Sequence, residues 1–80
     1  MNDLPVPLEA VTPGQWAEVT DVTGEPIWVG RLAEMGLRNG TCIQMLQPGE
    51  PCLIRVGEAR LSVRADGGTH ILVRPVRRSA

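Results

Sequence analysis

The chain has 80 residues, a formal net charge of −1 and 42% hydrophobic residues. This length allows one small domain, which buries roughly 60% of the surface of its unfolded chain and leaves little room for a deep catalytic cleft. Apart from one histidine, Trp16 and Trp28 supply the only aromatic rings, so the core must come from Val, Leu, Ile, Met and Ala. This composition excludes disorder over most of the chain.

All basic residues are arginines, and most lie in the C-terminal part. Residues 1–50 carry two arginines against seven acidic residues, whereas residues 51–80 carry six arginines against two. A guanidinium pairs with a carboxylate or phosphate through two parallel hydrogen bonds. The arginine-rich part therefore suits an acidic protein, an anionic lipid surface or a phosphate, unless it is simply a solvated face.

The N-terminal segment predicts a loose lead-in over residues 1–7 and a first strand over about residues 15–22, after the turn dipeptide Pro13-Gly14. In that strand Ala17 and Val19 share one face. The first residues lack the features of a signal peptide, and no apolar run approaches the ~20 residues of a membrane-spanning helix. We therefore expect a cytoplasmic protein that does not insert into a membrane.

A short helix is predicted next, because residues 23–26 (Thr-Gly-Glu-Pro) offer a cap at Thr or Gly and a proline in the first turn. Trp28, Leu32 and Met35 recur at helical spacing and predict one apolar stripe facing the core. Gly36 fits the left-handed position after a helix, and Leu37 is placed to fold back on the last turn.

The remainder of the chain predicts β-structure. Gly57-Glu58 suits a two-residue type II′ hairpin turn, and Pro75 places the end of the last strand at a sheet edge or outside the ladder. The expected strands cover residues 41–47, 53–56, 59–64 and 70–76, followed by a tail at residues 77–80. About five short strands and one helix predict a mostly β fold, a small antiparallel barrel in a single domain over residues 1–80.

Residues suited to catalysis are scarce. His70 is the only histidine, and Cys42 and Cys52 lie in apolar segments where burial leaves a thiol unreactive. We therefore expect no enzyme activity and no dedicated cofactor. A divalent transition metal fits only at His70 and Asp66, and only if a second chain completes the site. The strands after Gly40 lack the aromatic platforms of single-strand nucleic-acid binding, so no nucleic-acid partner is expected.

Residues 31–40 read RLAEMGLRNG, which resembles the signature of the FeoA family, small accessory proteins of bacterial ferrous-iron uptake. The resemblance extends over about residues 8–76, with a departure at residues 65–69, where the family often carries a charged helical turn. It implies an SH3-like barrel, a cytoplasmic location and no catalytic activity. It also implies a partner, the cytoplasmic GTPase portion of the membrane iron transporter FeoB.

Within this signature, we assign different roles to different positions. Arg31, Glu34 and Arg38 are expected to be exposed and to contact the partner, while Leu37 is either a contact within the helix end or an exposed anchor. Four positions are assigned to the fold, with the leucine and methionine in the core and the glycines at special backbone angles: Leu32, Met35, Gly36 and Gly40.

Two other functions stay open at this point. One is a metal-responsive module that forms a homodimer through a divalent ion held by His70 and Asp66. The other is a generic SH3-like module that binds proline-rich peptides, although such peptides usually dock on aromatic grooves that this chain lacks.

Overall fold

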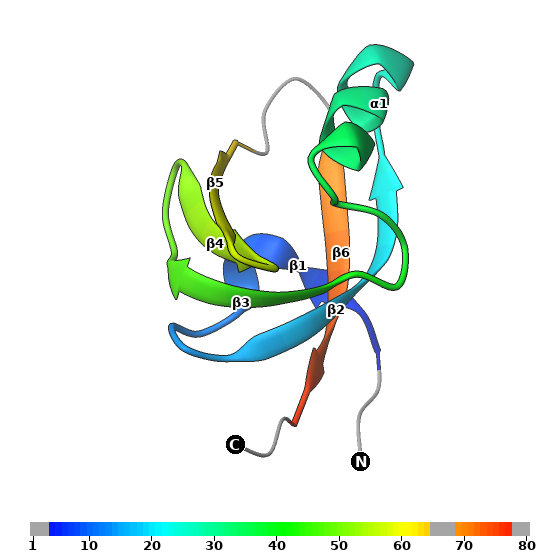
Figure 1. The fold of residues 1–80 in the computed structure, drawn as a ribbon. Helices are drawn as coiled ribbons and strands as arrows, with labels where there is room; N and C mark the ends of the chain where they lie inside the picture. Colours follow the sequence, from blue (N-terminus) through cyan, green and yellow to red (C-terminus); the bar gives the residue numbers. More distant parts are fainter. Residues whose placement is uncertain (1–3, 65–68, 78–80) are drawn as a thin grey trace.

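The computed structural model describes residues 4–64 and 69–77. Its strands form one curved antiparallel sheet in the order β1-β6-β2-β3-β4-β5, and the single α-helix, α1, packs at one end of it (Figure 1). In chain order the elements are β1 (Val6–Pro7), the 3-10 helix η1 (Leu8–Ala10), β2 (Trp16–Thr23), α1 (Pro26–Glu34), β3 (Cys42–Gln47), β4 (Cys52–Val56), β5 (Ala59–Val63) and β6 (His70–Val76).

The core lies inside the curve of the sheet, because the strands alternate apolar and polar side chains with the period of two that a half-buried strand requires. In β2, for example, Ala17 and Val19 are buried and Glu18 between them faces outward. The buried apolar cluster is entirely aliphatic or sulfur-containing, as the composition predicts: Leu8, Val11, Ala17, Val19, Leu32, Leu37, Ile43, Met45, Cys52, Ile54, Val63, Ile71 and Val73.

Two irregularities help the sheet to curve. The register of β2 against β6 shifts between Val19 and Asp21, and that of β3 against β4 shifts between Met45 and Gln47. Bulges of this kind bend a strand and increase its twist. The result is the SH3-like arrangement that was expected, although no ladder joins β1 to β5 within the described residues, so the barrel stays open on that side.

The five longer strands confirm the prediction, and the short β1 adds a sixth. Val6 and Pro7 pair with Val73 and Leu72 of β6, and Val6 packs against the buried cluster. The predicted lead-in over residues 1–7 is therefore too long, since an apolar side chain holds this part of it on the sheet. Of the predicted tail at residues 77–80, only Arg77 lies within the described residues. Residues 65–68, which belong to the segment where the sequence departs from the family pattern, lie outside them.

The turns and ends of the elements agree with their sequence signals except at the helix start and in part at Pro75. Pro75 stays in the ladder opposite Ala17 of β2, so a place outside the ladder is wrong, but β1 pairs with β6 only at Leu72 and Val73 and leaves this end of β6 at an edge on that side. Val56 and Ala59 flank the β4–β5 turn as a cross-strand pair, and Gly57 has φ = 61°, as a type II′ turn requires. Pro26 occupies the first turn of α1, but the N-cap is Glu25, with no side-chain cap. The capping role expected for residues 23 or 24 is thus wrong, because β2 continues through Thr23.

Candidate partner-binding site

The end of α1 is closed by backbone hydrogen bonds. The Gly36 N–H donates to the Ala33 carbonyl at 3.0 Å, and the Leu37 N–H donates to the Leu32 carbonyl at 2.8 Å. This pair of bonds is the Schellman motif, which brings the residue after the glycine back onto the last turn. Leu37 is accordingly only 1% exposed. Of the two roles considered for Leu37, the contact within the helix end is correct, and the exposed anchor is wrong.

The two glycines of the signature confirm their predicted backbone roles. Gly36 has φ = 99°, and a Cβ atom there would lie 3.2 Å from a methyl group of Val56. Gly40 has φ = 92° and donates its N–H to the Val19 carbonyl at 2.7 Å. Glycine adopts such angles without a steric penalty, so both positions serve the connection from α1 back to the sheet.

Thr41 completes this connection, although its side chain was not singled out from the sequence. Its hydroxyl donates to the Gly36 carbonyl at 2.8 Å and accepts the Arg38 backbone N–H at 3.2 Å. The Arg38 Nε donates to the Ala33 carbonyl at 3.0 Å, which satisfies a carbonyl in the last turn. A small hydroxyl residue directly after a glycine turn is the signal that would have identified this bond.

The apolar stripe predicted along α1 is not uniformly buried. Leu32 is 7% exposed, but Trp28 is 49% and Met35 46% exposed. Assigning Met35 to the core is therefore wrong, because the buried space below the helix end is taken by Leu37, which the Schellman motif folds inward. Ile27, beside Trp28, is 68% exposed, so apolar side chains reach solvent on more than one side of this short helix.

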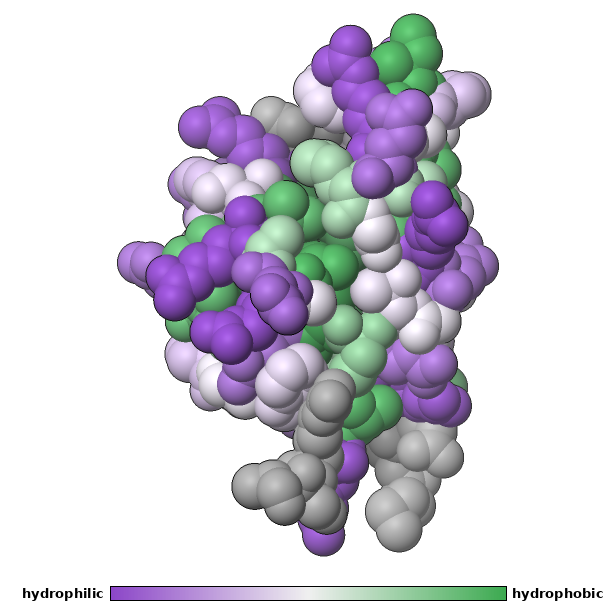
Figure 2. Space-filling view, in the orientation of Figure 1, coloured by the Kyte–Doolittle hydropathy of each residue, from purple (hydrophilic) through white to green (hydrophobic). Residues whose placement is uncertain are grey.

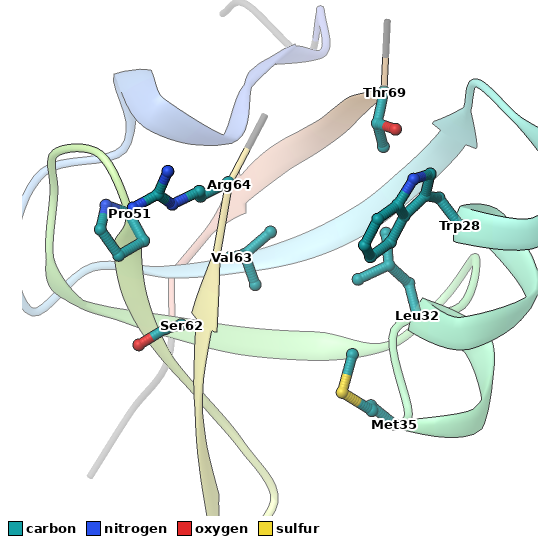
Figure 3. Close-up of a pocket in the computed structure, with 8 residues that line it drawn as sticks. All are labelled: Trp28, Leu32, Met35, Pro51, Ser62, Val63, Arg64 and Thr69. Atoms are coloured by element: carbon teal, nitrogen blue, oxygen red, sulfur yellow. The ribbon is translucent and has the colours of Figure 1, made fainter. Parts of the chain in front are cut away.

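A groove of about 350 Å³ lies between α1 and the β4–β5 hairpin. Trp28, Leu32 and Met35 face it from the helix, and Val63 points into it from β5 (Figure 3). Figure 2 shows apolar surface in the hollow between these elements, with hydrophilic side chains around it. The remaining lining residues are Pro51, Ser62, Arg64 and Thr69. We call this set the α1–β5 groove.

Charged side chains flank the α1–β5 groove. The Arg31 guanidinium lies over the Trp28 ring, 5.3 Å from its centroid, which is within the range of a cation–π contact. Arg64 lines the opposite wall and is exposed, and Glu34 is exposed in the last turn of α1. Arg31, Glu34 and Arg38 are thus exposed, as a contact role requires, and Arg31 contacts the groove residue Trp28.

The sequence did not identify the α1–β5 groove, since its lining comes from four separate segments. One signal was available: Ile27 and Trp28 are adjacent on a helix, so they point about 100° apart and cannot both face one core. Pro51, Ser62 and Arg64 carried no comparable signal, because only the position of the β4–β5 hairpin across from α1 places them there.

Arginines from the C-terminal part also gather on the outer face of the sheet. Arg55 of β4 lies directly opposite Arg60 of β5, and the Arg55 Nε is buried without a hydrogen-bond partner among the described residues. Arg74 of β6 forms an ion pair with Glu18 of β2, and both side chains are partly exposed. The basic surface predicted from composition is therefore divided, and part of it is neutralised within the sheet.

The metal-site residues are not assembled in the described structure. His70 is exposed at the start of β6, opposite Thr23, and Asp66 lies outside the described residues. No group of three or more His, Cys, Asp or Glu side chains suited to a metal ion occurs in residues 4–64 and 69–77. Cys52 is buried and Cys42 partly buried, with no disulfide between them. In the same residues, no helix is both long and apolar enough to span a bilayer.

Comparison with known proteins gives one consistent family. The family model described as the FeoA domain matches residues 6–75. A crystal structure of an iron uptake regulatory protein (FeoA) is 29% identical, with a TM-score of 0.80 over 91% of this chain and 100% of that chain. The FeoA protein from Chlorobium tepidum is 28% identical, with a TM-score of 0.80 over 94% of this chain and 74% of the other.

A third structure supports the fold alone. The iron(II) transport protein A from Clostridium thermocellum is 22% identical, with a TM-score of 0.79 over 89% of this chain and 46% of that chain. No curated protein matches the sequence.

Proposed function

This chain belongs to the FeoA family of ferrous-iron transport proteins, and from that premise we propose that it is an accessory protein that binds the cytoplasmic portion of a FeoB-like iron transporter. It acts in the cytoplasm and works by binding rather than by catalysis. The α1–β5 groove is the surface that we assign to the partner.

The observation that carries this proposal is the exposure of apolar side chains on α1. Trp28 and Met35 are each about half exposed and face the same groove. Large apolar side chains exposed together in a concave surface mark binding sites, since leaving them in water costs free energy that a partner can recover. Tryptophan is also among the residues that contribute most to binding free energies.

The groove favours a partner segment with a specific chemistry. Its apolar walls accept an aliphatic or aromatic side chain, while Arg31 and Arg64 flank it with positive charge. The partner segment therefore presents an apolar anchor next to acidic residues. Glu34 and Arg38 are exposed at the C-terminal end of α1. They serve as peripheral contacts that affect the association rate more than the dissociation rate.

A calorimetric titration against the cytoplasmic GTPase portion of the transporter from the same organism, with and without guanine nucleotide, tests the proposal. We expect saturable binding that Trp28→Ser and Met35→Ser each weaken about tenfold or more, because each removes an anchor. The matched control is Leu4→Ser, which removes an apolar side chain of 70% exposure that does not line the groove. No binding in either nucleotide state, or equal weakening by the control, would overturn the proposal.

Charge-reversal variants test whether Arg31, beside the groove, contributes more to the affinity than Glu34 and Arg38. Arg31→Glu is expected to weaken the complex more than Glu34→Arg or Arg38→Glu, since only Arg31 stacks on a groove residue. All three side chains are exposed, so the variants should fold, which circular dichroism checks. Unchanged affinity for Arg31→Glu would remove this residue from the site and leave the apolar groove as the binding surface.

A further inference from the structure

The strand β5 has an open edge. Within the described residues it pairs only with β4, at the end of the sheet order. Ala59, Arg60 and Ser62 are exposed, and Leu61 is partly exposed. An unpaired edge offers a row of free N–H and C=O groups to another strand, and folded proteins usually cover or disrupt such an edge.

The hairpin geometry determines which backbone groups are free. Val56 and Ala59 flank a two-residue turn, so Ala59 exchanges hydrogen bonds with β4. In an antiparallel ladder the direction of these bonds alternates along the strand. Leu61 and Val63 therefore also bond toward β4, while the N–H and C=O groups of Arg60 and Ser62 point toward the open side.

We infer that this edge pairs with the β5 edge of a second copy of the chain, antiparallel and centred on Leu61. In this register Arg60 of each copy lies opposite Ser62 of the other, so the four free backbone groups of each copy find partners. The two Leu61 side chains meet on the inner face, across the two-fold axis. The contact is isologous, which is the usual symmetry of a homodimer.

Charge selects this register over its neighbours. A shift of two residues in one direction places Arg60 opposite Arg60 of the second copy, and a shift in the other direction places Arg60 opposite Arg64. Like charges directly opposite each other destabilise a strand pair. In the Leu61-centred register, Glu58 lies alongside Arg64 of the second copy, and this ion pair occurs twice. The sequence of β5 and its two ends is therefore electrostatically complementary to itself.

In the proposed register the second strand enters the α1–β5 groove beside Val63. Val63 and Arg64 border the groove on the β5 side, and Trp28 and Met35 border it from α1. In the proposed register the residue facing Val63 is Ala59 of the second copy, which has the smallest side chain of the strand. The exposed parts of Trp28 and Met35 then cover that alanine, so the dimer and the transporter segment exclude one another from the groove.

Sedimentation equilibrium of the whole protein, with no transporter and with a metal chelator present, tests this inference. A five-residue strand pair forms a small interface, so we expect a weak dimer, with a dissociation constant of roughly 0.1–1 mM. Glu58→Arg and Arg64→Glu should each raise this constant about tenfold, because each places like charges together twice. The double variant Glu58→Arg/Arg64→Glu restores the pairs with exchanged signs and should return the constant to near its original value.

The control is Asp21→Arg, which makes the same charge change as Glu58→Arg at an exposed position of β2. It should leave self-association unchanged. Circular dichroism establishes that each variant folds. A monomer at all concentrations to about 1 mM, or single variants that dimerise as the original chain does, would overturn the proposal. So would a double variant that fails to restore the dimer. These results come from the isolated chain, so they leave transporter binding to its own test.

Discussion

The C-terminal end of α1 and its side facing β5 differ in how far their residues are buried or hydrogen-bonded within the fold. At the helix exit, by which we mean residues 36–41, Gly36 and Leu37 are hydrogen-bonded back to the last turn of α1, and Gly40 and Thr41 are bonded to β2. On the side facing β5, Trp28 and Met35 stay half exposed above a groove. The exit is therefore built for the fold, and the groove side has the unpartnered surface that binding requires.

The residues that mark the family and the residues of the proposed binding site therefore overlap only in part. The FeoA family model matches residues 6–75 and so includes the signature at residues 31–40, in which Gly36, Leu37 and Gly40 serve the exit. The surface that we assign to the partner takes Leu32 and Met35 from the signature, but it also needs Trp28, outside the signature, and Val63 and Arg64 of a different segment.

The sharpest stability contrast is between two apolar residues at the end of α1. Leu37→Ala should lower the free energy of unfolding by about 2–5 kcal/mol, since Leu37 is fully buried and its truncation leaves a cavity. Met35→Ala should lower it by less than about 1 kcal/mol, because nearly half of that side chain is already in water. Urea unfolding of both variants measures the contrast, and equal losses would contradict the assignment of Met35 to the groove.

A pair of glycine substitutions tests the exit in a second way. Gly36→Ala should cost about 1–3 kcal/mol, because the positive φ is strained for alanine and its Cβ would lie 3.2 Å from Val56. Gly30→Ala has the opposite expectation, a gain of up to about 1 kcal/mol, since Gly30 is inside the helix with open space around it. Thermal unfolding distinguishes them, and a stabilising Gly36→Ala would contradict the account of the helix end.

The Thr41 hydroxyl should contribute a smaller amount. Thr41→Val removes its bond to the Gly36 carbonyl and should lower the free energy of unfolding by about 1 kcal/mol. Thr12→Val is the matched control, because the Thr12 hydroxyl bonds only to the partly exposed Gln15 side chain among the described residues. Chemical denaturation compares the two, and a larger loss for Thr12→Val would show that the exit does not depend on Thr41.

The smallest effect is expected far from both sides of α1, at the ion pair between Glu18 and Arg74. Glu18→Gln should change the free energy of unfolding by no more than about 1 kcal/mol, because both side chains are partly exposed and screened by salt. Unfolding at low and high ionic strength measures this. A loss as large as that of Leu37→Ala would show that the outer face of the sheet, and not the helix exit, dominates stability.

The sequence predicted local features well and the site poorly, for a physical reason. The helix exit depends on neighbours in the chain, since Gly36 and Leu37 bond to carbonyls only a few residues earlier. The β4–β5 turn is equally local, as the φ of Gly57 shows. The groove depends instead on α1 and β5, about thirty residues apart in the chain, facing one another in the fold, which no periodicity encodes.

Met35 illustrates the same limit within a single helix. Helical spacing groups it with Leu32 and predicts burial, but the Schellman motif folds Leu37 into the core at this end of α1, while Met35 stays half exposed. Periodicity identifies a face of the helix. It does not identify how much of that face the rest of the fold covers.

The most direct test of the central claim, that the groove and not the helix exit binds the partner, is an NMR titration. Labelled protein, kept dilute enough to be monomeric, is mixed with the cytoplasmic portion of the transporter, and chemical shift changes are mapped. We predict the largest changes at the Trp28 indole, the Met35 methyl group and the amides of Ser62 to Arg64. Changes centred instead on Gly40 and Thr41, with the Trp28 and Met35 signals unmoved, would contradict it.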